Sequence, residues 1–289
     1  MEKDKKSDNF PPEQQDSQPG IEKEMQVKPK FIRDGYKGSD KLKDKVALVT
    51  GGDSGIGRSV CVHFAREGAD IALCYVPKEK EDAEDTKKMI EKEGRKCLLL
   101  PGDLRDKKYC ESIVEQTVKE FGKLNILILN AAIQNPVDDL KDLDDKQIED
   151  TFDVNILSQF RVTRAALKHM HEGDCIVSDA SINAYRGHKK LVDYSSTKGA
   201  IMGFVRSMSQ QLVEKGIRVN AVAPGPIWTP LIVATFPPDH VKEFGKSAPM
   251  KRAGQPMEVG TCFVFLASED SSYITGQCLH PNGGNILNT

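Results

Sequence analysis

Tyr194 and Lys198 are the most suggestive pair of chemically active residues, in the segment Tyr194-Ser195-Ser196-Thr197-Lys198. Residues four apart lie on the same face of a helix. A free tyrosine has a pKa of about 10 and is a poor acid or base at neutral pH. A nearby ammonium group favours the phenolate and lowers that pKa, so the pair predicts a proton-transfer unit. The same spacing also occurs on solvated helix faces, and the context has to separate the two interpretations.

A glycine-rich turn, Thr50-Gly51-Gly52-Asp53-Ser54-Gly55-Ile56-Gly57, joins an apolar run to an amphipathic segment. Gly51, Gly55 and Gly57 have GxxxGxG spacing rather than GxGxxG. Glycines permit a tight turn and let backbone amides approach a diphosphate at a helix N-terminus. The position of the turn favours nucleotide binding over the alternative, a turn that only requires positive φ.

The choice between NAD and NADP depends on the charge near the adenosine ribose. An acid about 20 residues past the glycines would bind the 2′-hydroxyl and select NAD. The second apolar run instead ends Leu73-Cys74-Tyr75-Val76-Pro77-Lys78, with neither an acid nor an arginine at that point. Asp53 would repel a 2′-phosphate, whereas Lys78 and Lys80 would attract one. The sequence favours NAD and leaves NADP open.

Seven short apolar runs alternate with amphipathic segments from residue 45 onward. The runs lack period-2 alternation, which is typical of strands buried on both faces of a parallel sheet. Gly68 and Gly122 follow two of the amphipathic segments, as glycine does after helices. The pattern predicts an α/β fold with one Rossmann-type, doubly wound, parallel seven-stranded sheet in a single domain over residues 45–289. The predicted strands are Val46–Thr50, Ile71–Val76, Cys97–Pro101, Leu124–Asn130, Asp174–Ser178, Arg218–Ala223 and Gln277–Pro281.

Residues 1–44 differ in composition from the rest of the chain. Pro11, Pro12, Pro19 and Pro29 interrupt any helix, and polar residues fill the gaps between them. A disordered tail and an extended arm both fit this composition. We expect no catalytic residue in this segment. The apolar residues that would dock such an arm on the body or on a neighbouring subunit are Phe10, Ile21, Met25, Val27, Phe31 and Ile32.

Composition excludes several classes of function. The 289 residues are 29% charged and 38% hydrophobic, with a formal net charge of −2. This balance offers no electrostatic basis for binding nucleic acid or an anionic membrane, and the apolar runs are too short to span a bilayer. The seven cysteines are odd in number and form no CxxC pair, so we expect neither a disulfide framework nor a metal site. We expect a reduced, cytoplasmic protein.

From residue 45 to 288 the chain resembles the short-chain dehydrogenase/reductase family. The N-terminal extension resembles a bacterial subgroup described as glucose or ribitol dehydrogenase-like. The resemblance implies a homotetramer that transfers hydride between a nicotinamide cofactor and an alcohol or carbonyl substrate. The motifs that carry it, in the family's order, are Thr50-Gly51-x-x-x-Gly55-x-Gly57, Asp103-Leu104, Asn130-Ala131, Asn155, Ser181, Tyr194-x-x-x-Lys198 and Pro224-Gly225.

The resemblance also implies catalytic roles. Tyr194 would be the acid–base group, and Lys198 would lower the Tyr194 pKa and hold the nicotinamide ribose. Ser181 would orient the substrate oxygen, and Asn155 would hold a water that links Lys198 to solvent. The implied cofactor-binding residues are Gly51, Asp53, Ser54, Gly55, Ile56, Gly57, Asp103, Leu104, Asn130, Ala131, Tyr194, Lys198, Pro224, Gly225, Ile227 and Thr229.

Two residues depart from the family pattern. Ala132 stands where the family often has glycine against the cofactor, and Asp179 adds a charge where small neutral residues are common. The segment 227–252 matches the family's substrate lid. Two alternative functions stay open: an NADP-dependent ketone or acyl reductase, and a cofactor-binding redox sensor with little turnover. The intact Ser181, Tyr194 and Lys198 argue against the sensor.

Overall fold

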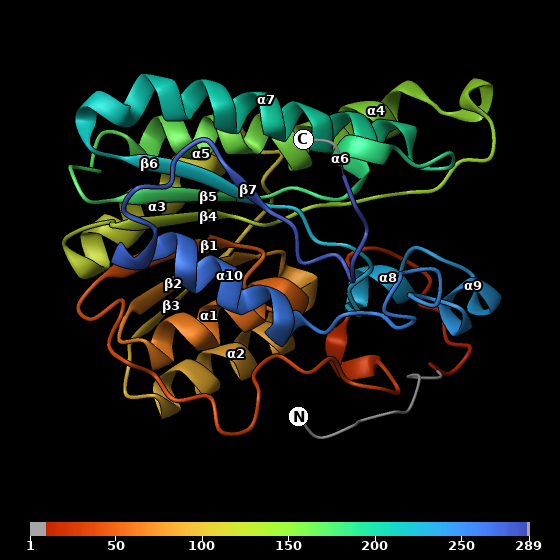
Figure 1. Cartoon of the computed structure of the whole chain (residues 1–289), viewed down its shortest axis with the longest axis horizontal. Coiled ribbons are helices and arrows are strands. Elements are labelled where there is room, and N and C mark those ends of the chain that lie inside the picture. The colour runs from red at the N-terminus through yellow and green to blue at the C-terminus, as the bar shows by residue number, and fades with distance from the viewer. Residues whose placement is uncertain (1–9, 288–289) are drawn as a thin grey trace.

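Seven parallel strands form one sheet in the computed structural model, which describes residues 10–287 (Figure 1). Residues 1–9 of the predicted arm and residues 288–289 of the predicted body lie outside the described residues. The strand order is β3-β2-β1-β4-β5-β6-β7, and every pairing is parallel. The predicted Rossmann-type sheet is therefore confirmed. The strands are β1 (Val46–Thr50), β2 (Asp70–Tyr75), β3 (Cys97–Pro101), β4 (Ile126–Leu129), β5 (Cys175–Asp179), β6 (Arg218–Val222) and β7 (Cys278–Leu279).

Side-chain hydrogen bonds replace backbone pairing at the ends of β1 and β4. β1 and β4 are buried along their whole length, as strands covered on both faces must be. β4 is shorter than the predicted run because Asn125 accepts the Val46 amide through its side chain, 3.1 Å away. At the other end Asn130 donates its amide to the Thr50 hydroxyl, 2.8 Å away. β7 keeps only two residues at the sheet edge, and Pro281 lies beyond it.

Two layers of helices cover the two faces of the sheet (Figure 1). Phe64 and Phe263 anchor one apolar core, whereas Ile113 and Val205 belong to the other. Gly260 lets the two helices of the first layer meet closely, since a Cβ there would lie 2.4 Å from the Ser59 hydroxyl. The first layer holds α1 (Gly55–Arg66), α2 (Lys80–Lys92) and α10 (Pro256–Ala267), and the second holds α3 (Lys107–Phe121), α5 (Ser158–Ala166) and α7 (Val192–Leu212).

Shorter elements connect the strands and the long helices. Two of them, α8 (Pro230–Val233) and α9 (Pro238–Lys242), lie in the segment expected to be a lid. The others are the 3₁₀ turns η1 (Glu22–Glu24), η2 (Pro77–Glu79), η3 (Leu140–Asp142), η5 (Val213–Lys215) and η6 (Glu269–Ser271), the helices α4 (Asp145–Phe152) and α6 (Asn183–Arg186), and the π-helical turn η4 (Asp153–Leu157). Within residues 10–287, no helix combines the length and apolarity needed to cross a membrane.

Residues 10–44 run along the body as an extended arm, whose red first part lies beside α8 and α9 and whose orange part passes α1 and α2 (Figure 1). Phe10 stacks on Trp228 with ring centroids 3.7 Å apart, and Met25 is also buried. Val27 is 42% exposed, so its side chain does not dock on the body. Its backbone docks instead, because its carbonyl accepts the indole N–H of Trp228 at 2.9 Å. Aromatic stacking and backbone hydrogen bonds thus hold the arm to the lid.

Candidate active site

The carboxyl ends of the strands open into a cavity of about 930 Å³. Ligands of open α/β sheets bind at this edge, and the volume is typical of a small-molecule site. Each predicted cofactor-binding residue and the predicted catalytic Ser181 line the cavity. Asn155 does not.

The glycine turn is shaped as a cradle at the start of α1. Gly51 and Gly55 have φ of +63° and +51°, a region that side chains other than glycine rarely adopt. A Cβ on Gly57 would lie 1.8 Å from the Gly51 carbonyl oxygen, so only glycine fits there. Asn130 donates from its side chain to the Thr50 and Gly51 carbonyls, at 3.0 and 2.9 Å. The shape of this cradle suits a diphosphate bound by backbone amides. Asn130 holds the glycine turn in place.

Two acids, Asp53 and Glu79, line the cavity beside the end of β2. Burial raises the pKa of the Asp53 carboxyl, and Oδ2 of that carboxyl has no hydrogen-bond partner. Burial and the negative charge of Asp53 raise the pKa of Glu79 well above its usual range. The pair therefore retains a proton at neutral pH, since two buried carboxylates side by side cannot both ionise cheaply.

Neither lysine considered for phosphate binding lines the cavity. Lys78 donates its ammonium to the Ser17 hydroxyl, 2.7 Å away, and Lys80 pairs with Glu84 at 3.7 Å. The expectation that these lysines attract a 2′-phosphate has no support in the structure, because the N-terminal arm and α2 engage both of them.

Tyr194, Lys198 and Ser181 meet on one wall of the cavity, and all three are buried. Tyr194 and Lys198 project from the first turns of α7, and Ser181 follows β5. The Lys198 ammonium donates to the backbone carbonyl of Asp179 at 2.7 Å and lies 5.4 Å from the Tyr194 ring centroid. The hydroxyl of Ser181 accepts the Asn183 amide at 3.1 Å, which orients it.

The electrostatics of this group set the direction of two pKa shifts. Burial raises the pKa of Tyr194, the Asp179 carboxylate raises it further, and the Ser181 hydroxyl only partly opposes them. Burial lowers the pKa of Lys198, and Asp179 opposes that change. The expected lowering of the Tyr194 pKa by Lys198 stays a prediction.

Asp179 thus brings an ionisable carboxyl into the site. Its carboxyl is buried, and burial raises its pKa to about 7 although Lys198 opposes the shift. Oδ1 of Asp179 has no hydrogen-bond partner. The charge of this carboxyl changes near neutral pH, so it tunes Tyr194 within the working range of an enzyme.

Asn155 lies behind the catalytic residues, in the π-helical turn η4. Its side chain accepts the Ile133 amide at 2.8 Å and donates to the Ile133 carbonyl at 2.9 Å. It also donates to the Thr197 hydroxyl at 3.2 Å. These contacts tie the loop after β4 to α7, and the expected role of Asn155, holding a water that links Lys198 to solvent, stays a prediction.

The outer end of the cavity contains residues of the expected lid, together with His188. Phe236 stacks on His240 with ring centroids 4.2 Å apart, and Glu243 lies at the same rim. His188 faces Phe236 at 6.5 Å. The arm also contributes a stretch of cavity wall, formed by Ser17, Gln18, Pro19 and Gly20. No local pattern marks these four residues, because their partners lie far along the chain.

Comparison with known proteins defines the class. Residues 51–285 match the family model described as enoyl-(acyl carrier protein) reductase. A short-chain dehydrogenase from Burkholderia cenocepacia, solved in complex with NADP, superposes with a TM-score of 0.79 at 30% identity, covering 84% of this chain and 98% of that one. The chain belongs to the short-chain dehydrogenase/reductase family.

Relatives with most of the same length refine the comparison. An uncharacterised oxidoreductase of Bacillus subtilis, YhdF, is 54% identical over 286 residues, 99% of each chain. The glucose and ribitol dehydrogenase of Daucus carota is 51% identical over 284 residues, 96% of this chain and 98% of that one. This protein is an NAD(P)-dependent oxidoreductase that transfers hydride between a nicotinamide cofactor and an alcohol or carbonyl.

Proposed function

We propose that Tyr194 is the acid–base group of this oxidoreductase and that Ser181 and Lys198 assist it. The observation that carries the proposal is the meeting of these three side chains in the cavity that also contains the glycine cradle. The bound nicotinamide donates or accepts the hydride. Ser181 holds the substrate oxygen, and Tyr194 gives a proton to that oxygen or takes one from it. Lys198 holds the nicotinamide ribose and carries a positive charge beside the phenol.

We further propose that the enzyme prefers NAD to NADP. Asp53 and Glu79 face the end of β2, where the adenosine ribose of such cofactors binds. The Asp53 carboxylate would accept a hydrogen bond from the ribose 2′-hydroxyl, and its charge would repel a 2′-phosphate. Lys78, which the sequence analysis considered for phosphate binding, is held by the arm. The Burkholderia relative, in contrast, was solved in complex with NADP.

The substrate we propose is a small hydroxylated alcohol or the corresponding carbonyl compound. The outer rim combines hydrogen-bonding groups, His188, His240 and Glu243, with the apolar side chains of Phe236 and Phe244. Polar groups that converge in a partly apolar pocket suit a small polyol. Glucose and ribitol are the first compounds to test, since the carrot relative is named for them.

The test compares Tyr194→Phe with Tyr273→Phe, a change at a fully exposed tyrosine (103%) outside the cavity. Turnover of the Tyr194 variant should fall about 10²- to 10⁴-fold, the usual contribution of acid–base catalysis. Its dissociation constant for NADH, measured by fluorescence, should stay close to that of the unaltered enzyme. Full activity of Tyr194→Phe would refute the assignment. Parallel titrations with NADH and NADPH test the cofactor preference, and tighter NADPH binding would refute it.

We also propose that the protein is a cytoplasmic homotetramer. Leu157 and Phe160, near the start of α5, are 41% and 51% exposed, and β7 lies at an open sheet edge. Exposed apolar side chains of this size suit a contact between subunits. The seven unpaired thiols suit a reducing compartment. Light scattering and cell fractionation test the two statements, and a monomer or a secreted protein would refute them.

A further inference from the structure

The N-terminal arm forms a closed loop against the cofactor cavity. Gln15 closes its base, accepting the Ile21 amide at 2.7 Å and donating to the Ile21 carbonyl at 2.8 Å. The tip of the loop, residues 17–20, lines the cavity, and we call these four residues the strap. The two bonds between Gln15 and Ile21 lie within the arm. They fix the shape of the strap without any contact from the rest of the protein.

The strap is attached on three sides of the cavity. At the end of β2, Lys78 donates to the Ser17 hydroxyl at 2.7 Å and to the Pro19 carbonyl at 3.2 Å. After β4, Gln18 donates to the Asn135 side chain at 2.8 Å. At α8, a Cβ on Gly20 would lie 2.4 Å from the Pro230 carbonyl oxygen, so the strap backbone packs directly on the lid. The strap therefore crosses from the adenosine side of the cavity to the lid.

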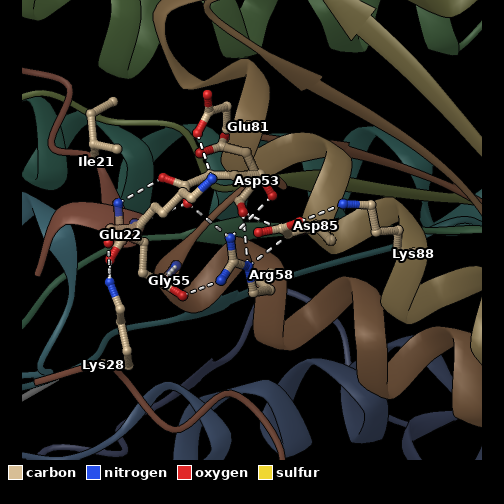
Figure 2. Close-up of polar contacts among 12 residues, drawn as sticks. Ile21, Glu22, Lys28, Asp53, Gly55, Arg58, Glu81, Asp85 and Lys88 are labelled. Carbon is tan, nitrogen blue, oxygen red and sulfur yellow. Dashed lines mark hydrogen bonds and ion pairs between the residues drawn. The ribbon is translucent and has the colours of Figure 1, made fainter.

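Glu22, two residues beyond the strap, fastens the arm to the glycine cradle (Figure 2). Its carboxylate accepts the Gly55 amide at 2.7 Å, at the first residue of α1, and pairs with the Arg58 guanidinium. Its own amide donates to the Asp82 carboxylate at 2.7 Å. The Glu22 side chain is 3% exposed and that of Arg58 is 7% exposed. Charge-assisted hydrogen bonds excluded from water are among the strong ones.

Arg58 extends this fastening to the cradle itself. Its Nε donates to the Asp53 carbonyl at 2.9 Å and to the Thr86 hydroxyl at 2.8 Å. Its Nη2 donates to the Asp82 carbonyl at 3.0 Å. One buried cation thus joins the arm, the glycine turn and α2. A change at Glu22 leaves Arg58 with one fewer anion and loosens the arm, whereas the contacts of Arg58 and Thr86 with the Asp53 carbonyl still hold the glycine turn.

We propose that the strap closes over the bound dinucleotide and that Glu22 is the positioning residue that keeps it closed. The inference rests on the proposed cofactor site. NAD(H) exchange then requires the strap to lift, so the Glu22 contacts set the rate of cofactor release. Hydride transfer does not depend on the strap, because no strap residue lies among the catalytic side chains.

The test measures the rate of NADH release by stopped-flow fluorescence in the full chain. Glu22→Gln keeps the size of the side chain but removes the anion that pairs with Arg58. Release should become about tenfold faster or more, as expected for loss of a charge-assisted hydrogen bond. The rate of hydride transfer in a single turnover should not change, which separates a positioning role from general damage. The matched control is Glu24→Gln, an exposed glutamate in the same turn.

A second variant covers the case in which Glu22→Gln does not fold. Gln18→Ala removes the contact with Asn135 and leaves the buried charges intact, and it should also speed NADH release. Unchanged release in Glu22→Gln, or in Gln18→Ala if only that variant folds, would overturn the strap. Failure of the unaltered enzyme to bind NADH would instead overturn the proposed cofactor site.

Discussion

Replacing Gly57 with alanine tests the glycine cradle most directly. The added methyl carbon would lie 1.8 Å from the Gly51 carbonyl oxygen and 2.8 Å from Nδ2 of Asn130. Real Cβ atoms essentially never approach closer than 3.0 Å, and the first obstacle is backbone. The start of α1 and the glycine turn must therefore separate by about 1 Å. The loss of about two backbone hydrogen bonds to the charged diphosphate, at about 1.5 kcal/mol each, should weaken binding about 100-fold. A loss of this size equals about 2.8 kcal/mol of binding free energy.

The assay for Gly57→Ala is the dissociation constant of NADH, measured by fluorescence titration. The matched control is Gly203→Ala in α7, where the new methyl meets nothing within 4 Å. That control should bind NADH normally and gain about 0.4–1 kcal/mol in stability, because alanine restricts the unfolded chain. Circular dichroism should show that both variants fold. Unweakened NADH binding by a folded Gly57→Ala would refute the assignment of this turn to the cofactor diphosphate.

Two further predictions concern the pH dependence and the arm. Asp179→Asn removes the carboxylate that raises the Tyr194 pKa, so the basic form of Tyr194 should be reached at lower pH. The pH profile of kcat/KM for alcohol oxidation should shift towards acid, and an unshifted profile would contradict this electrostatic role. Phe10→Ala should weaken arm docking by about 3–5 kcal/mol, the usual cost of deleting a buried ring. The single tryptophan, Trp228, should then emit at longer wavelength, whereas Val27→Ala should leave the emission unchanged, and an unshifted Phe10→Ala spectrum would show that the arm does not dock there.

Local patterns in the sequence determined most of the fold and the list of site residues. Buried strands appear as continuous apolar runs because both of their faces exclude water. The glycine turn is visible because only glycine tolerates its backbone angles and close contacts. Tyr194 and Lys198 are visible because one helix turn separates them. These features depend on neighbours within a few residues, so the amino-acid order alone reveals them.

The tertiary structure decided what depends on distance through space. Glu22 contacts Gly55 at the start of α1, 33 residues further along the chain. Ser17 contacts Lys78, 61 residues further along. The direction of the Tyr194 pKa shift depends on burial and on Asp179, neither of which a helical spacing contains. The sequence by itself therefore determined which groups the site contains. Only the tertiary structure decided how far the site is shielded from solvent, which charges face each other, and that the arm forms one wall of the cavity.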